Sequence, residues 1–298
     1  MKYMTETAKQ LPVRAKADVV VCGGGPAGIG AALSAARNGV KTVLLESHGF
    51  LGGMGTAGMV TSFAYGYHDK ERFITGGIFQ EIRQKLFDRD GLIMTDRKGW
   101  EPFNAEQYKI LAFELLAEAG VELLCHTSIV DTITTDGTID AVIIESKAGR
   151  EVLLATNVID ATGDGDVAER AGAECKIGRE KDGGTQPSSL MYVLGNVDTK
   201  ELGDMLDEQE RRGYWKTEDG YYYLNATGFA DEIKQAKQDG FLTKVNRDHV
   251  AAIFTVPWMD NVVGINFGRI QGKNALDPRD LTDAEVIGRE QVLDASPF

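Results

Sequence analysis

The feature that most constrains this chain is a short apolar run that ends in a glycine-rich turn. Residues 19–22 read Val-Val-Val-Cys, and Gly23, Gly25 and Gly28 follow with the spacing G-x-G-x-x-G. Small residues at helical spacing come next: Ala31, Ala32, Ala35 and Ala36. A buried strand, a glycine turn and a helix in this order make a βα unit that binds nucleotides. Such a turn lets backbone N–H groups approach a pyrophosphate at the positive end of the helix. We therefore predict a dinucleotide site here.

A carboxylate follows the second predicted strand, residues 41–46. Glu46 lies 18 residues beyond Gly28 (46 − 28), where a carboxylate can accept hydrogen bonds from both hydroxyls of an adenosine ribose. It would repel a 2′-phosphate, which disfavours NADP. A surface acid at a strand end is the alternative. Gly52-Gly53 follows in a loop, where a flexible backbone suits a chain passing along a pyrophosphate, although an ordinary turn is also open.

A second run of small residues ends a later strand. Residues 157–160 are expected to form this strand, and Ala161-Thr162-Gly163-Asp164-Gly165-Asp166 follows directly. Small side chains would let this backbone pack against a dinucleotide near the first glycine turn. We expect Asp166 to cap a short helix at 167–172, and Asp164 stays open between capping and a role in the site.

The order of the predicted elements indicates an α/β fold. Helices are expected at 26–38, 73–87 and 105–119, and strands that build a parallel sheet at 18–22, 41–46, 121–125 and 157–160. Three further strands, at 128–134, 139–145 and 151–155, are separated by glycine turns and read as an antiparallel meander.

The pattern of apolar and polar residues changes after about residue 175. Strands are expected at 188–194, 249–256 and 261–267, helices at 199–212 and 228–239, and a last helix at 281–294 capped by Thr282 or Asp280. We predict a Rossmann-like dinucleotide-binding domain at 1–175, with a helical or irregular insertion at 60–104. A smaller α+β substrate or cap domain would follow at 176–270, and 271–298 would begin an incomplete return to the first domain.

Composition narrows the function classes. The 298 residues carry a formal net charge of −13, which argues against nucleic acid or an anionic membrane as a main partner. Cys22, Cys125 and Cys175 form no C-x-x-C pair, and no histidine spacing indicates a metal site. No apolar signal region or spanning stretch is present. We expect a cytoplasmic protein without a metal, and the oligomeric state stays open.

Together these features resemble the FAD-dependent oxidoreductases of the glutathione-reductase-like fold, and in particular the branch related to fumarate reductase and succinate dehydrogenase flavoproteins. The matching pieces are GGGPAG at 23–28, Glu46, Gly52-Gly53, the strand and meander at 121–155, and ATGDGD at 161–166. The resemblance implies FAD as cofactor, with its pyrophosphate at the first motif, its ribose at Glu46 and its adenine beside the backbone near Ile129. The predicted cofactor-binding residues are Gly23, Gly25, Pro26, Ala27, Gly28, Glu46, Ser47, Gly52, Gly53, Ile129, Ala161, Thr162, Gly163 and Asp164.

The chain departs from this family in two places. Relatives with covalent flavin attach it through a histidine in the glycine-rich loop after the second strand, and residues 51–59 contain none. His48 lies too early, so we predict non-covalent FAD. The family also closes its site with a C-terminal glycine–aspartate motif, which we do not find after Asp166. We therefore expect the front part of a longer flavoprotein, or a naturally short paralogue.

Flavin carries the hydride chemistry in such proteins, so the protein supplies binding, orientation and charge. Arg269 follows the predicted strand 261–267 and could hold a substrate carboxylate; a structural ion pair is the alternative. With one dinucleotide fingerprint and no redox cysteine pair, electrons would come from the substrate or a separate carrier.

The leading hypothesis is an FAD-dependent oxidoreductase that moves a hydride equivalent between a small organic substrate and flavin. The alternatives are an NAD-dependent dehydrogenase, which the meander at 121–155 disfavours, and a non-catalytic FAD-binding fragment or interaction module.

Overall fold

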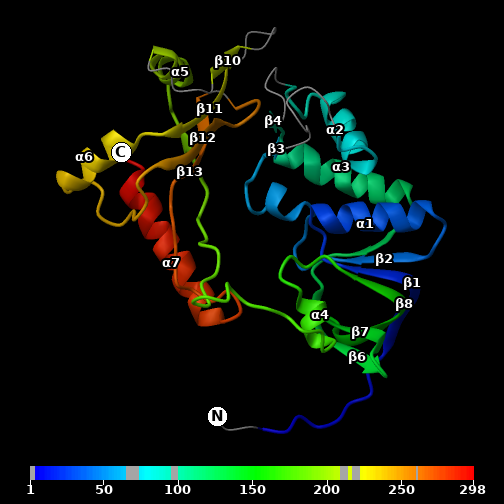
Figure 1. Ribbon diagram of the computed structural model, residues 1–298. Helices are drawn as coiled ribbons and strands as arrows, with labels where there is room; N and C mark the ends of the chain where they lie inside the picture. Colours follow the sequence, from blue (N-terminus) through cyan, green and yellow to red (C-terminus); the bar gives the residue numbers. More distant parts are fainter. Residues whose placement is uncertain (1–3, 65–73, 95–99, 209–213, 217–221, 260) are drawn as a thin grey trace. The chain divides into compact units, whose positions relative to one another are not determined.

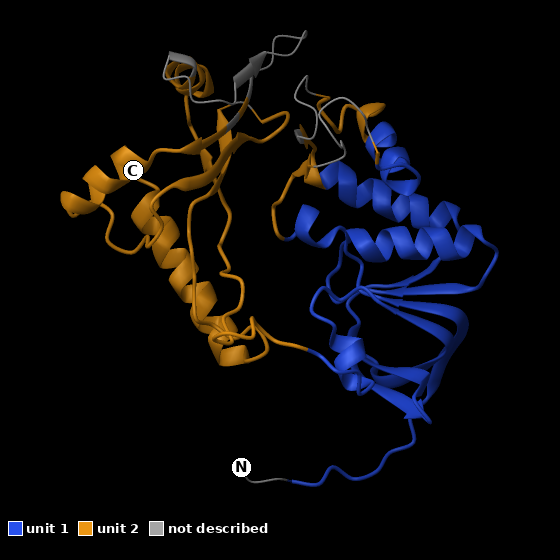
Figure 2. Cartoon of the chain, viewed as in Figure 1, with its two compact units in different colours: residues 1–57, 75–85, 106–175 blue, residues 58–74, 86–105, 176–298 orange. Residues whose placement is uncertain are grey.

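The structure is a computed structural model that describes residues 4–64, 74–94, 100–208, 214–216, 222–259 and 261–298 (Figure 1). The chain divides into two compact units (Figure 2). Unit 1 comprises residues 1–57, 75–85 and 106–175, and unit 2 comprises residues 58–74, 86–105 and 176–298. The predicted division into functional domains rests on a different criterion and stays a prediction.

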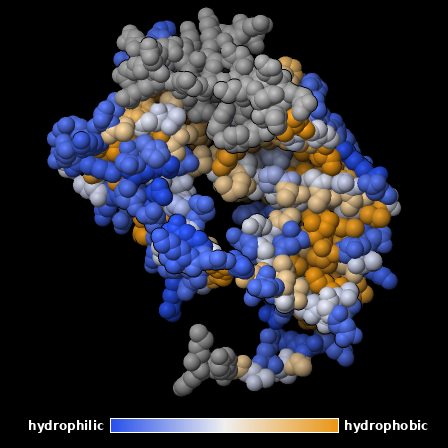
Figure 3. Space-filling view, in the orientation of Figure 1, coloured by the Kyte–Doolittle hydropathy of each residue, from blue (hydrophilic) through white to orange (hydrophobic). Residues whose placement is uncertain are grey.

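Unit 1 is built on a six-stranded sheet with the order β5-β2-β1-β8-β7-β6. Its strands are β1 (Val13–Cys22), β2 (Thr42–Leu45), β5 (Glu122–Leu124), β6 (Ser128–Thr135), β7 (Thr138–Ser146) and β8 (Gly149–Asp160). The pairs β5–β2, β2–β1 and β1–β8 are parallel, and β8–β7 and β7–β6 are antiparallel. All four residues of β2 are buried, as expected for an apolar run covered on both faces of a sheet. Figure 3 shows apolar residues gathered where this sheet lies.

Helices cover this sheet. Those of unit 1 are α1 (Pro26–Arg37), most of α2 (Ile78–Phe87), α3 (Ala105–Glu118) and the short α4 (Asp166–Arg170), together with the 3₁₀ turn η1 (Gly53–Gly55). In Figure 1 α1, α2 and α3 lie on the same side of the sheet. The charged pair of Arg37 and Glu81, with a nitrogen–oxygen distance of 2.6 Å, joins α1 to α2. Val20 and Leu33 are both fully buried in the layers that meet here.

Unit 2 contains a five-stranded antiparallel sheet with the order β10-β11-β12-β13-β9. Its elements are β9 (Tyr192–Gly195), β10 (Tyr214–Lys216), β11 (Tyr222–Gly228), β12 (Val250–Thr255), β13 (Val262–Asn266), α5 (Thr199–Glu208), α6 (Ala230–Gln238) and α7 (Pro278–Ala295), with a two-stranded ribbon of β3 (Ser62–Ala64) and β4 (Trp100–Pro102). Leu206, Ile233 and Ala295 bring α5, α6 and α7 into one hydrophobic core with the sheet.

The predicted fold class is confirmed: parallel strands and an antiparallel meander form one α/β sheet, and an α+β unit accompanies it. That second unit was predicted to be the smaller one, but it comprises more residues than unit 1. One detail was wrong. The segments 151–155 and 157–160 form the single strand β8, which pairs with β7 through residues 149–154 and with β1 through residues 152–160. Thr156 and Asn157 interrupt the apolar pattern, but the backbone runs on because β1 supplies ladder partners on the other edge.

Several boundaries also differ from prediction: β1 begins at Val13 rather than residue 18, and α2 begins at Ile78 rather than residue 73. The strand expected at 188–194 begins at Tyr192, with only an isolated bridge between Ser188 and Ile270 before it. The last helix begins at Pro278, and its cap is Asp277, whose carboxylate accepts a hydrogen bond from the N–H of Arg279 at 2.8 Å. Thr282 and Asp280 are therefore not the cap. Pro278 fits the first helical position because proline has no N–H to satisfy there.

Two glycines of α1 allow a matched test of its packing. A Cβ added at Gly28 would lie 1.8 Å from the backbone oxygen of Gly23, whereas one added at Gly30 would have no heavy atom within 4 Å. We expect Gly28→Ala to lower the free energy of unfolding by about 2 kcal/mol or more, because the backbone must shift. Gly30→Ala should be neutral or stabilising by up to about 1 kcal/mol, because alanine favours the helix. Urea unfolding of both variants measures these changes in the free energy of unfolding. An equal loss of stability in Gly28→Ala and Gly30→Ala would contradict the packing described for Gly28.

Candidate functional site

A cavity of about 450 Å³ opens at the carboxyl ends of the parallel strands in unit 1. Its volume falls in the range of small-molecule sites, about 300–1,000 Å³. It is lined by the glycine turn, the end of β2, the 3₁₀ turn, the start of β6 and the segment after β8. The lining residues are Gly23, Gly24, Gly25, Pro26, Ala27, Leu45, Glu46, Ser47, His48, Gly53, Met54, Ser128, Ile129, Ala161, Thr162, Gly163 and Asp166. Ligands of open α/β sheets bind at this edge.

The glycine turn is packed tightly on one side and open on the other. Gly23 has φ of 106°, and a Cβ there would lie 2.3 Å from the backbone oxygen of Ala161. The turn is therefore pressed against the segment that follows β8. At Gly25 the nearest atom to an added Cβ is the Cα of Gly53, at 4.0 Å. The protein itself does not demand a glycine at position 25, so the bare backbone leaves room for a ligand.

The N-terminus of α1 faces this cavity without a side-chain cap. Gly25 is the N-cap residue and supplies no side-chain hydrogen bond, Pro26 is the first helical residue, and the first turn carries no acidic side chain. Ala27 is exposed and lines the cavity. The first N–H groups of a helix have no partner within the helix, and its dipole favours negative charge at this end. This helix end is therefore suited to bind an anionic phosphate group.

Glu46 is buried, with 7% of its surface exposed, and both oxygens of its carboxylate contact the turns around it. Oε2 accepts a hydrogen bond from the N–H of Gly24 at 2.8 Å. Oε1 accepts from the N–H of His48 at 2.7 Å and lies 2.8 Å from its ring Nδ1, and the hydroxyl of Ser47 donates to it at 3.1 Å. Burial raises the pKa of Glu46, but these donors outweigh it and hold the pKa below its ordinary value. The side chain is thus a carboxylate at neutral pH.

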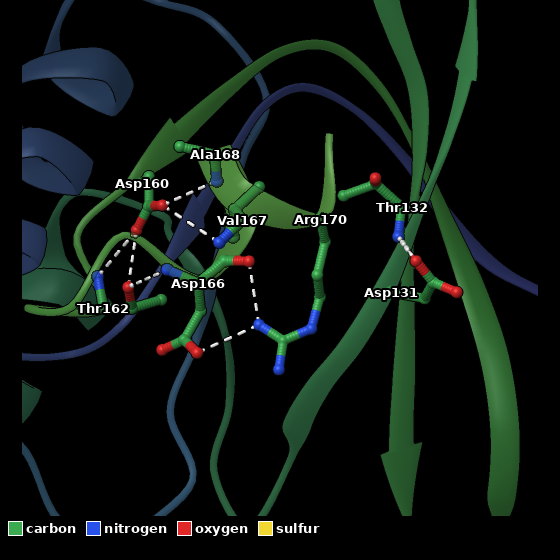
Figure 4. Close-up of polar contacts among 8 residues, drawn as sticks. All are labelled: Asp131, Thr132, Asp160, Thr162, Asp166, Val167, Ala168 and Arg170. Carbon is green, nitrogen blue, oxygen red and sulfur yellow. Dashed lines mark hydrogen bonds and ion pairs between the residues drawn. The ribbon is translucent and has the colours of Figure 1, made fainter. Parts of the chain in front are cut away.

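Asp160, the last residue of β8, organises the segment after it (Figure 4). Its Oδ1 accepts from the N–H and the hydroxyl of Thr162, at 3.0 and 2.7 Å. Its Oδ2 accepts from the N–H groups of Val167 and Ala168, at 3.0 and 2.9 Å, at the start of α4. Burial raises the pKa of Asp160, but the Thr162 hydroxyl and the backbone donors lower it below its ordinary value.

The prediction that Asp166 caps this helix was wrong. Asp166 lies inside α4, and its carboxylate pairs with Arg170 one turn later at 3.0 Å (Figure 4). Gly165 is the N-cap residue, with φ of 77° and no side chain to offer. Asp160 takes the capping role because the turn at 161–165 folds back and brings the helix start over the strand end.

The structure brings most of the predicted site residues together. Eleven of them line the cavity: Gly23, Gly25, Pro26, Ala27, Glu46, Ser47, Gly53, Ile129, Ala161, Thr162 and Gly163. Gly28 and Gly52 are buried behind the turns and do not line it. Asp164 is exposed and also does not line it. Arg269, the predicted substrate-binding residue, belongs to unit 2 and is not among the lining residues of this cavity.

Sequence reasoning missed several lining residues. Gly24, Leu45, Met54 and Ser128 are neighbours of predicted residues, and strand register alone could have added them. His48 lies only two residues after Glu46, and both its backbone N–H and its ring contact the Glu46 carboxylate. Among the residues that the structure describes, no group of three or more His, Cys, Asp or Glu side chains is placed to hold a metal ion. No helix in the same residues is long and apolar enough to cross a membrane.

The arrangement agrees with comparisons to known proteins. The family model described as FAD dependent oxidoreductase matches residues 18–298. The chain belongs to this family. The predicted family and its cofactor, FAD, are thereby confirmed, while the narrower resemblance to the fumarate reductase branch stays a prediction.

Individual relatives are more distant. A thiamine thiazole synthase of Methanococcus maripaludis (strain C7) is 36% identical over 133 residues, which are 44% of this chain and 47% of that protein. The match to this curated relative thus spans about half its length. Among solved structures, a geranylgeranyl bacteriochlorophyll reductase-like protein of Thermoplasma acidophilum has a TM-score of 0.53 at 16% identity, covering 94% of this chain and 62% of that one. A myxobacterial chondrochloren halogenase has a TM-score of 0.50 at 14% identity, covering 93% and 60%. These structures share the fold.

The residues present fit FAD. The bare backbone at Gly25 and the uncapped end of α1 offer N–H groups and space to a pyrophosphate. Glu46 is ionised and lines the same cavity, where a carboxylate can accept from ribose hydroxyls. Among the described residues that line the cavity there is no lysine or arginine, which a 2′-phosphate would need.

Asp160 and Asp166 provide a second matched pair. We expect Asp160→Ala to lower the free energy of unfolding by about 2 kcal/mol, because it leaves the N–H groups of Val167 and Ala168 without an acceptor. Asp166→Ala removes only an exposed ion pair and should cost less than about 1 kcal/mol. Since the folded pKa of Asp160 is lowered, its contribution is present above the ordinary aspartate pKa and is lost as the pH falls through the lowered value.

The difference in the free energy of unfolding between the wild type and Asp160→Ala should accordingly become smaller below about pH 4. Urea unfolding of the three proteins across this range provides the measurement. A larger loss for Asp166→Ala than for Asp160→Ala would restore Asp166 as the helix cap.

Proposed function

We propose that this chain binds FAD non-covalently at the β1–α1 turn and acts as an oxidoreductase on a small organic substrate. The observation that carries the proposal is the cavity in which the open backbone of Gly25, the uncapped end of α1 and the carboxylate of Glu46 lie together. When bound, flavin would accept or donate a hydride equivalent. The residues of unit 1 described here would bind and orient it.

The roles divide along the cavity wall. The turn at 23–28 would hold the pyrophosphate, and Glu46 the adenosine ribose. The start of β6 at Ile129 would lie along the adenine. Gly163, which has no side chain, would let the backbone after β8 approach the cofactor closely. The absence of histidine from residues 51–59 supports non-covalent binding.

Glu46 has a limited capacity for new donors. Oε1 already serves three donors from Ser47 and His48, whereas Oε2 serves only the N–H of Gly24. Each carboxylate oxygen offers about two lone-pair sites, so Oε2 has one acceptor position left. One ribose hydroxyl can therefore bind Oε2 directly. A second hydroxyl would bind Oε1 only if the exposed ring of His48 or the Ser47 hydroxyl moved away.

The other parts of the proposal rest on sequence. The curated relative named thiamine thiazole synthase supports an enzymatic function, and its own activity is not part of the proposal. The small-molecule substrate and hydride transfer rest on the family resemblance. Because the sequence has a single dinucleotide fingerprint and no redox cysteine pair, electrons would come from the substrate or from a separate carrier. An NAD-dependent dehydrogenase remains the competing function.

Glu46 can be tested against a matched exposed acid, Glu122 of β5. We expect Glu46→Gln to weaken FAD binding at least about tenfold, because a charge-assisted hydrogen bond is worth about 1.5–3 kcal/mol. Glu122→Gln should leave binding unchanged. Riboflavin 5′-phosphate lacks the adenosine, so its weaker binding should be the same in all three proteins. Flavin fluorescence titration measures each affinity, with circular dichroism to check folding.

Two outcomes would contradict the proposal. The first is a wild-type protein that binds no FAD, or that binds NAD more tightly than FAD. The second is bound FAD that cannot be reduced by any donor and reoxidised, followed as loss and return of the oxidised flavin absorbance; this result would leave a binding module rather than an enzyme.

A further inference from the structure

Two arginines of unit 2 come together at one end of its sheet. Arg247 lies shortly before β12, and Arg269 lies shortly after β13. These strands are antiparallel, with Ala252 opposite Asn266. In an antiparallel pair the residues before one strand lie beside those after the other, so the topology places the two arginines next to each other. The sequence separation of 22 residues hides this arrangement.

Neither guanidinium has an acidic partner within ion-pair distance among the residues that the structure describes. The Nε atoms of Arg247 and Arg269 are both buried and without a hydrogen-bond partner in that part of the chain. The one side-chain contact that either makes there is between Nη2 of Arg247 and Nε2 of His249, at 3.1 Å. Asp248 is the nearest acid in sequence, but its side chain is 93% exposed and faces the His249 ring at 3.0 Å.

The two positive charges act on each other. Burial, followed by the positive charge of Arg269, lowers the pKa of Arg247, and Asp248 opposes this shift. Half-buried like charges repel, and arginine stays charged at all relevant pH values. The chain as a whole is acidic, with a net charge of −13, so two neighbouring arginines without an acidic partner contrast with its overall charge. Among the residues that the structure describes, no acidic side chain pairs with either guanidinium, so nothing there compensates the repulsion between the two charges.

The backbones that carry both arginines are held firmly. Gln291 of α7 is buried; its Oε1 accepts from the N–H of Arg269 at 2.9 Å, and its Nε2 donates to the Arg269 oxygen at 3.1 Å. Lys237 at the end of α6 donates to the backbone oxygen of Arg247 at 2.6 Å. Between them, Gly268 leaves no room for a side chain, since a Cβ would lie 2.9 Å from Gln291 Oε1. The backbone from which each arginine side chain extends is therefore anchored by hydrogen bonds to a neighbouring helix.

We propose that Arg247 and Arg269 form a binding site for a small oxyanion, either the carboxylate or the phosphate group of a small molecule. A guanidinium presents N–H groups in a planar fork that matches two oxygens of such a group, and two forks can enclose one anion. The anion would supply the acceptors that the buried Nε groups lack and would neutralise the repulsion between the charges. The site belongs to unit 2 alone and does not depend on FAD binding at β1–α1.

The test uses the whole chain with three probes: succinate, inorganic phosphate and the neutral analogue succinamide. Calorimetric titration compares the wild type with Arg247→Gln, Arg269→Gln and the control Arg289→Gln, which removes an exposed arginine of α7. We expect saturable one-to-one binding of succinate, phosphate or both to the wild type and the control. Affinity should fall at least about tenfold in Arg247→Gln and in Arg269→Gln, and succinamide should not bind.

The relative affinities of succinate and phosphate decide whether the site is suited to carboxylates or phosphates. A readout without ligand guards against misfolding: because each variant removes one of two repelling charges, both should unfold at the wild-type temperature or above. The proposal is overturned if neither anion binds, if succinamide binds as tightly as succinate, or if Arg289→Gln loses as much affinity as the other variants.

Discussion

The close approach of two backbones at the end of β1 is the constraint on which the rest of unit 1 depends. Gly23 turns with positive φ against the backbone oxygen of Ala161, and Gly28 lies on the backbone oxygen of Gly23. Three chain segments, the end of β1, the start of α1 and the segment after β8, meet where no side chain fits. This contact aims the N-terminus of α1 at the open edge of the sheet, and the cavity forms there.

Two carboxylates stabilise the loops around this contact in the same way. Glu46 at the end of β2 holds Gly24 and His48, and Asp160 at the end of β8 holds Thr162 and the start of α4. For each group burial alone would raise the pKa, and hydrogen bonds to the charged form lower it instead. The two carboxylates differ in the acceptor positions that remain for a ligand. Glu46 faces the cavity with one acceptor position unused, whereas both oxygens of Asp160 accept two hydrogen bonds each from the protein.

Local patterns predicted the parts that depend on local physics. The glycine spacing at 23–28, the buried run of β2 and the position of Glu46 all follow from short-range geometry, and they yielded the fold class and most of the cavity lining. The predictions were wrong where a contact with a segment distant in sequence determines the local structure. Asp166 has a residue type and a position that favour a helix cap, yet the first N–H groups of α4 donate to Asp160 at the end of β8 instead. Residues 156–157 read as a break, yet β1 pairs along both halves of β8. Arg247 carries no sequence signal, because only the register of β12 and β13 brings it to Arg269.

A crystal structure of the whole chain grown with FAD tests the central claim most directly. We predict that the pyrophosphate lies at the N-terminus of α1, within hydrogen-bond distance of the Ala27 N–H, and that an adenosine ribose hydroxyl binds Oε2 of Glu46. FAD bound elsewhere, with the turn at 23–28 empty and Glu46 contacting only Gly24, Ser47 and His48, would contradict it.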